Sequence, residues 1–132
     1  MRTLRVLVLA HPDLVPPDVV SALSPRESFE IKTEYDVIST LRRSGHDVHV
    51  LGVQWELRPV RETVDVIKPD IVFNLMEEFH GETVYDHNVV SFLELMKVPY
   101  TGCNPRGLML SRGKALSKKL LAYHRIRVPD FG

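Results

Sequence analysis

Residues 4–10 read LRVLVLA, a nearly continuous run of branched apolar side chains. A half-exposed strand would alternate apolar and polar residues, whereas an unbroken apolar run is typical of a parallel strand that helices cover on both faces. We therefore predict that residues 4–10 form the central strand of an α/β sheet.

Downstream of this strand, helix-like and strand-like segments alternate. Apolar residues recur at helical spacing in some segments, and short apolar or alternating runs separate them. The predicted helices are 31–44, 59–67, 84–96, a stretch from Asn104 to Leu110, and 114–124, and the predicted strands are 47–53, 71–75 and 99–102. Parallel strands joined through helices form right-handed crossovers. The predicted fold is a Rossmann-like open α/β sheet, mostly parallel, with about four strands flanked by helices.

The segment between the first strand and the first helix, residues 11–30, differs from the rest of the chain. It carries four prolines and several acidic residues. We predict a long loop with one helical turn near residues 18–23. Loops at strand ends often carry binding residues.

Charge and composition restrict the classes of partner. Seventeen Lys and Arg residues balance seventeen Asp and Glu residues, so no net field attracts nucleic acid or an anionic membrane. The length fits one domain. The single cysteine, Cys103, cannot form an internal disulfide, and we recognise neither a signal peptide nor a membrane span. We expect a cytoplasmic domain with no nucleic-acid or membrane partner.

The densest polar cluster follows the predicted strand 71–75. It contains Asn74, Glu77, Glu78, His80, Gly81, Glu82, Asp86 and His87. Open α/β sheets bind ligands beyond the carboxyl ends of their strands, and carboxylates with a histidine there could hold a substrate ammonium group. A solvated loop whose acids offset nearby helix ends fits these residues equally well. His11 would line the same edge if its strand is a neighbour.

Other features carry weaker signals. The spacing of His80 and His87 matches no common metal motif, and Cys103 has no recognisable base, so we predict neither a metal site nor a catalytic cysteine. No glycine-rich dinucleotide or P-loop motif occurs. The basic residues near the last helix suit either a solvated surface or a phosphate contact. They are Arg112, Lys114, Lys118 and Lys119.

The second half of the sequence contains several motifs in a definite order. A strand ending at Asn74 leads to a Gly-Glu loop, then to L-E-L followed by V-P-Y-T-G at residues 98–102, then to a K-A-L-S-K-K-L-L run that begins at Lys114. From Pro69 to Phe131 this order resembles the first domain of D-alanine–D-alanine ligases and their ATP-grasp relatives. The first half of the chain matches that family in layout alone.

This resemblance implies a three-domain ligase. ATP, held with Mg²⁺ between the second and third domains, would phosphorylate a carboxylate, and an amine would attack the product. Residues 1–126 would be the amino-terminal domain and 127–132 the start of a linker or central domain, inactive alone and without a tightly bound cofactor. In the family's pattern Lys114 reaches the ATP phosphates, and family first domains often form homodimers. The loop facing the amino-acid or dipeptide substrate would contribute Glu77, His80 and Glu82.

Departures from the family's pattern leave the substrate open. Cys103 replaces a usual serine, and Arg112-Gly113 precedes the lysine where Met-Asp or Leu-Asp is usual. By this resemblance the family's first-loop glutamate would be Glu27 or Glu30. Both remain candidates because no motif fixes the register around Pro25. We take Glu27 as the candidate, and a role in peptidoglycan precursor synthesis follows from the resemblance alone.

Two other functions compete with the ligase domain. A free-standing binding or dimerisation module could retain the ligase scaffold without its chemistry. A response-regulator-like domain shares the wound topology, but it needs acidic residues after the first strand and an aspartate after the third. Ala10-His11-Pro12 and Asn74-Leu75-Met76 occupy those positions, which excludes that function.

Overall fold

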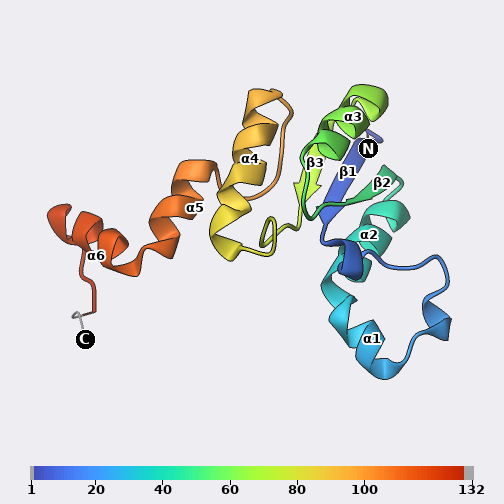
Figure 1. Cartoon of the computed structure of the whole chain (residues 1–132), viewed down its shortest axis with the longest axis horizontal. Coiled ribbons are helices and arrows are strands. Elements are labelled where there is room, and N and C mark those ends of the chain that lie inside the picture. Colours follow the sequence, from blue (N-terminus) through green and yellow to red (C-terminus); the bar gives the residue numbers. More distant parts are fainter. Residues whose placement is uncertain (1, 130–132) are drawn as a thin grey trace.

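The protein is an open α/β sheet with helices on both faces (Figure 1). The structure, a computed structural model, describes residues 2–129. The three strands are β1 (Arg5–Ala10), β2 (Asp47–Gly52) and β3 (Ile71–Asn74). The helices are α1 (Pro25–Glu30), α2 (Lys32–Arg43), α3 (Arg58–Ile67), α4 (Asp86–Leu95), α5 (Pro105–Arg112) and α6 (Lys114–Tyr123). Short 3₁₀ turns cover Pro12–Leu14, Val20–Ala22 and Thr83–Tyr85.

β1 is the centre of the sheet, as its apolar run predicts. The strand order is β2-β1-β3, and β1 pairs in parallel with both neighbours. Leu7 and Leu9 point to one side, where they join a core with residues of α3 and α4. Val6 and Val8 point to the other side, where Ile38 of α2 packs on them. The predicted fold class is confirmed.

The fourth strand is shorter than predicted. Only one parallel bridge, between Val72 and Tyr100, extends the sheet beyond β3. The Val72 N–H donates to the Pro99 carbonyl at 2.8 Å, and the Thr101 N–H donates to the Val72 carbonyl at 3.0 Å. Gly102 then adopts φ 97°, which turns the chain out of the extended conformation. The sheet has three strands in the described residues, with one bridging residue in place of the fourth.

The loop over residues 11–30 is more structured than predicted. Its predicted helical turn is present as Val20–Ala22, but its last six residues form the helix α1. Ser24 caps α1: its Oγ accepts from the Glu27 N–H, and the Glu27 carboxylate accepts from the Ser24 N–H at 2.8 Å. Pro25 at the first helical position adds to this start signal. The four prolines favoured the prediction of a loop, although the sequence S-P-R-E at residues 24–27 matches a capping box.

The other helices confirm their predictions. α2 ends before Gly45, which has φ 87°. α5 begins after Asn104, whose Oδ1 accepts from the Gly107 N–H at 2.8 Å. None of the helices in the described residues is long and apolar enough to cross a bilayer. The segment 127–132, predicted to begin a linker or central domain, includes residues 130–132, which lie outside the described residues.

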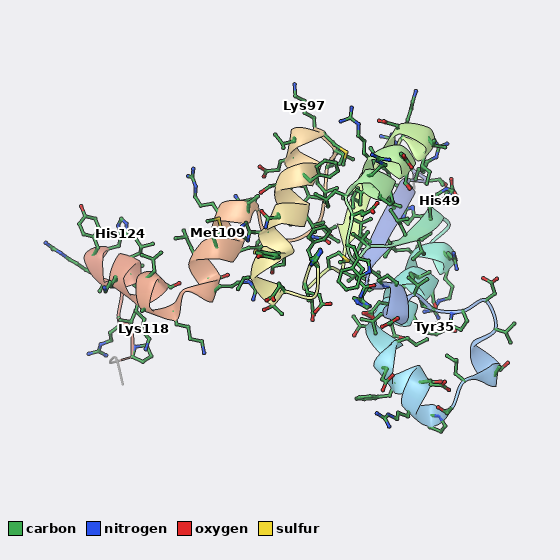
Figure 2. The ribbon with its side chains drawn as sticks, in the orientation of Figure 1. Tyr35, His49, Lys97, Met109, Lys118 and His124 are labelled. Carbon is green, nitrogen blue, oxygen red and sulfur yellow. The ribbon has the colours of Figure 1, made fainter. Side chains whose placement is uncertain are left out.

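α5 and α6 form an arm that extends away from the sheet (Figure 1). α5 packs against α4, and α6 packs against α5. Neither helix of the arm contains a buried residue. Lys118 and His124 project from α6 at the far end of the molecule (Figure 2). The predicted boundary between a first domain, 1–126, and a following segment stays a prediction.

Candidate functional site

A cavity of about 390 Å³ lies at the carboxyl ends of β1 and β3. Because these parallel strands are neighbours, the residues that follow them meet at the same edge of the sheet. His11 follows β1, and Glu77 and Glu78 follow β3; all three line the cavity, as does Glu34 of α2. The expectation that His11 shares this edge with the acidic loop is therefore confirmed. With Asp13, which also lines it, the cavity gathers four carboxylates and one imidazole.

Glu34 is the buried carboxylate of this cavity. It lies in the first turn of α2, and the residue is 7% exposed. Its Oε2 atom is buried and has no hydrogen-bond partner among the described residues. A buried acceptor without a partner costs on the order of 1–3 kcal/mol, and more when it is charged. Because Glu34 lines the cavity, its carboxylate brings an acceptor without a protein partner to the cavity wall.

Sequence reasoning missed Glu34, although its position carried a signal. Glu34 lies three residues after Ile31 and four before Ile38, and both of these isoleucines are buried. It is therefore a charged residue on the apolar stripe of α2. A carboxylate at such a position is rarely buried without a reason.

His11 has a defined orientation in the cavity wall. Its Nδ1 accepts from the Asp13 N–H at 3.1 Å, so in the neutral ring the proton sits on Nε2. Nε2 lies 3.5 Å from Oε1 of Glu78. The side chain of His11 is largely buried. This arrangement directs an imidazole N–H toward an acidic partner, and a protonated His11 would form an ion pair with it.

The loop after β3 divides the predicted substrate residues. Asn74 shapes its start, because its Oδ1 accepts from the Met76 N–H at 3.1 Å. Glu77 is exposed and lines the cavity, together with Glu78. Glu82 lies outside the lining and is exposed in a bridge with Phe79, although Thr83 after it lines the cavity.

His80 lies outside the cavity. Its ring contacts Trp55 edge to face at a centroid distance of 5.1 Å, and its backbone N–H donates to the Gln54 carbonyl at 2.7 Å. It lines a separate, mostly apolar groove of about 680 Å³ with Leu57, which precedes α3, and Phe92 of α4. The structure therefore brings Glu77 to the cavity and places His80 and Glu82 elsewhere.

Glu27 and Glu30 also lie away from the cavity lining. Glu27 is occupied as the capping carboxylate of α1, and the hydrogen bond from the Ser24 backbone N–H, followed by that with the Ser24 side chain, lowers the pKa of Glu27. Glu30 pairs with Arg26 at 3.2 Å. A substrate role for Glu27 stays a prediction.

Lys114 is the first residue of α6, and its side chain is exposed on the arm. Gly113, directly before it, forms the corner between α5 and α6. In this structure the lysine and the cavity belong to different regions of the molecule, the arm and the sheet edge (Figure 1). A phosphate contact by Lys114 stays a prediction.

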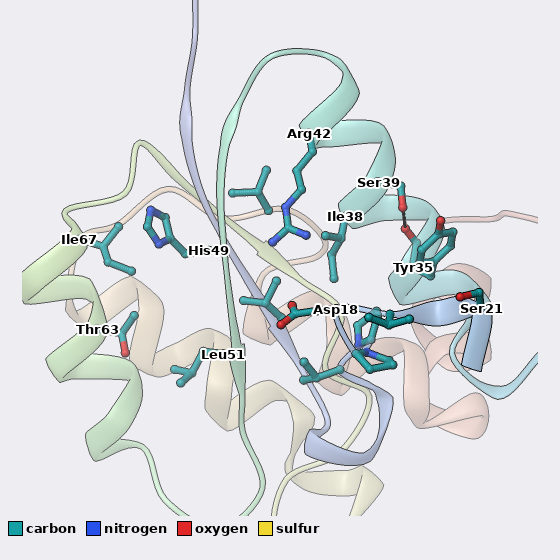
Figure 3. Close-up of a pocket in the computed structure, with 16 residues that line it drawn as sticks. Asp18, Ser21, Tyr35, Ile38, Ser39, Arg42, His49, Leu51, Thr63 and Ile67 are labelled. Atoms are coloured by element: carbon teal, nitrogen blue, oxygen red, sulfur yellow. Dashed lines mark hydrogen bonds between the residues drawn. The ribbon is translucent and has the colours of Figure 1, made fainter. Parts of the chain in front are cut away.

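A larger cavity, about 840 Å³, borders β2 and lies away from the predicted residues (Figure 3). Arg42 and Tyr35 of α2, His49 of β2 and Asp18 of the preceding loop surround it. No carboxylate there is both buried and unpaired among the described residues. Size alone does not define a site, and we assign the candidate site to the smaller cavity on chemical grounds.

No metal centre is formed by the residues from 2 to 129. No three His, Cys, Asp or Glu side chains among them lie close enough together to hold an ion. Cys103 is exposed and free.

The fold and the cavity define a class: a Rossmann-like domain that presents carboxylates and an imidazole at the carboxyl edge of its sheet. The resemblance to D-alanine–D-alanine ligases is also confirmed. The chain is 32% identical over 108 residues to the D-alanine–D-alanine ligase of Aquifex aeolicus, an alignment that covers 82% of this chain and 35% of that protein.

Two further comparisons extend this result. A D-alanine–D-alanine ligase from Coprothermobacter proteolyticus is 28% identical over 108 residues, covering 82% of this chain and 34% of that enzyme. The crystal structure of the D-alanine–D-alanine ligase from Bacillus anthracis complexed with ATP matches with a TM-score of 0.67 at 22% identity, covering 98% of this chain and 38% of that one. No family model matches the chain. The chain spans about a third of the length of the curated relatives it matches.

Proposed function

We propose that this chain is the substrate-side, amino-terminal domain of an ATP-dependent ligase that joins a carboxylate to an amine, similar to D-alanine–D-alanine ligase. The observation that carries this proposal is the unpaired carboxylate of Glu34 in the cavity at the carboxyl edge. The similarity to ligases of about three times this length supports assigning the chain to one domain of a larger enzyme.

The cavity suits the ammonium group of an amino acid. Glu34 offers a buried acceptor, and Glu77 and Glu78 add negative charge at the rim. A charge-assisted hydrogen bond to a buried carboxylate is stronger than one in water, because the site is shielded from solvent. Fixing the amino acid in this way lowers the entropic cost of bringing the amine and the carboxylate together. The domain would contribute positioning to the reaction.

Lys114 supplies the second part of the proposal. A cation at this position would contact the phosphates of ATP from the arm, as the family's pattern implies. When bound, ATP supplies the phosphoryl group that activates the carboxylate. No three carboxylates among residues 2–129 lie close enough together to hold Mg²⁺. In the proposed enzyme the metal would be held by the central and C-terminal domains.

A second function, a non-catalytic binding or dimerisation module, is favoured by one surface. The apolar groove along α4 is lined by Leu95, which is 80% exposed, and Trp55, which is 56% exposed, contacts His80 of its lining. A contiguous apolar surface of this kind suits association with another protein surface. Homodimer formation through the first domain is compatible with both functions. A cytoplasmic location and a role in peptidoglycan precursor synthesis belong to the ligase proposal.

Release of ADP by the full-length protein tests the choice between these functions. We expect ADP release that depends on D-alanine, and we would compare it with release in the presence of L-amino acids and of dipeptides. This 132-residue chain serves as the control and should release none. Failure of every amino acid and dipeptide to stimulate ADP release would favour the binding module.

A further inference from the structure

An ion pair joins the start of α4 to the end of α5. Asp86 is the first residue of α4 and is 5% exposed, and Arg112 is the last residue of α5. The Arg112 Nε donates to Oδ1 of Asp86 at 3.2 Å, and Nη2 donates to Oδ2. Two parallel bonds between a planar guanidinium and a carboxylate fix an angle as well as a distance. This pair therefore sets how the end of α5 lies on α4.

A second joint ties α6 to the end of α5. The Ser117 hydroxyl, in the first turns of α6, donates to the Leu110 carbonyl of α5. The Ser117 N–H donates to the Gly113 carbonyl at 2.8 Å. The last turn of α5 and the first turn of α6 are thus bonded across the corner. A movement of the end of α5 would carry the start of α6 with it.

Lys114 lies at this corner, two residues after Arg112. α6 contains no buried residue, and it packs on α5, which packs on α4 (Figure 1). The position of Lys114 therefore depends on how α5 packs against α4. Asp86, whose carboxylate holds the end of α5, belongs to α4. This helix covers the sheet, and its Val89 and Leu93 belong to the core.

We propose that Arg112 is a positioning residue for Lys114: its ion pair with Asp86 holds the corner of the arm so that the lysine meets the phosphates of ATP. This inference rests on the proposed function of Lys114 and adds a residue to it. Arg112 itself does not need to touch the nucleotide.

Steady-state kinetics of the full-length protein tests the proposal through a double-mutant cycle. We expect Arg112→Gln to raise KM for ATP about 10-fold, because a displacement near 1 Å can have effects of that size or larger. The KM for the amino acid should change less than about twofold, because the cavity belongs to the sheet edge. In a Lys114→Ala background, Arg112→Gln should add no further increase in KM for ATP.

Two variants control for general damage to the fold. Arg112→Lys keeps the charge that pairs with Asp86 but loses the fork geometry, so its KM for ATP should lie between those of the unchanged protein and Arg112→Gln. It also keeps the fold testable if Arg112→Gln does not fold. Arg106→Gln removes the same charge from the other end of α5 and should leave both KM values unchanged.

The outcomes separate this inference from the function on which it rests. If Lys114→Ala leaves KM for ATP unchanged, the proposed phosphate contact is wrong. If Lys114→Ala raises that KM but Arg112→Gln does not, the positioning role alone is wrong. Equal increases from Arg112→Gln in the presence and absence of Lys114 would also overturn it, because the two residues would then act independently.

Discussion

The sheet and the arm of this protein are held together by different interactions. β1 is buried along residues 6–10 and has helices packed on both sides. The arm, α5 and α6, has no buried residue, and its apolar side chains such as Leu116 are half exposed. Burial therefore determines the sheet, whereas the Asn104 cap and the ion pair between Arg112 and Asp86 help to hold the arm. Substitutions in the sheet should change stability, and substitutions in the arm should mainly change function.

The largest effect is expected in β1. Leu9→Ala removes a side chain that is 0% exposed from the core shared with α3 and α4, and should lower the free energy of unfolding by about 3–5 kcal/mol. Leu116→Ala, the matched change on the arm, should cost less than about 0.5 kcal/mol. Urea denaturation followed by circular dichroism measures both. Similar losses for the two variants would remove the contrast between the two regions.

A smaller effect of opposite sign is expected at the cavity. Glu34→Met replaces a buried, unpaired carboxylate with an apolar chain of similar length, so it should raise the free energy of unfolding by about 1 kcal/mol. Glu30→Met, at an exposed position on α1, is the control and should have little effect. Loss of stability in Glu34→Met would show that the carboxylate has a structural partner.

The smallest effect concerns the cap of α1. Because the folded pKa of Glu27 is lowered from its ordinary value of 4.5, its contribution is present above that value and is lost as pH falls through the folded pKa. Ser24→Ala should cost about 0.5 kcal/mol by removing the other half of the capping box. Amide chemical shifts of residues 26–30 between pH 7 and pH 3 report the loss of α1.

Glu27→Gln provides the control for this titration. It should abolish the pH dependence of the α1 shifts while leaving those of α2 unchanged. Persistence of the same transition in Glu27→Gln would assign the titration to another group.

The elements with strong local signals could be predicted from the sequence. The apolar run of β1 and the Asn104-Pro105 start of α5 each reflect physics within a few residues. The fourth strand could not be sized in this way, because its pairing depends on where Val72 and Pro99 meet. The helix α1 was predictable from its capping box, but the prolines around it dominated the interpretation.

The candidate site was predictable only in part. The edge of the sheet and the participation of His11 and Glu77 follow from topology, because parallel neighbours end on the same side. Glu34 reaches the cavity from α2, beyond the long segment that follows β1, and the sequence does not show which way its carboxylate points. The separation of His80 from Glu77 depends on the turn between them, where His80 adopts φ 58°.

The binding of the amino acid through Glu34 is the central claim, and the kinetics of Glu34→Gln in the full-length protein test it most directly. We predict ADP release that depends on D-alanine, with KM for the amino acid raised about 10-fold or more by the substitution, since a charge-assisted hydrogen bond is lost. KM for ATP should be unchanged. An unchanged KM for the amino acid in Glu34→Gln would contradict the account and return the cavity to a structural role.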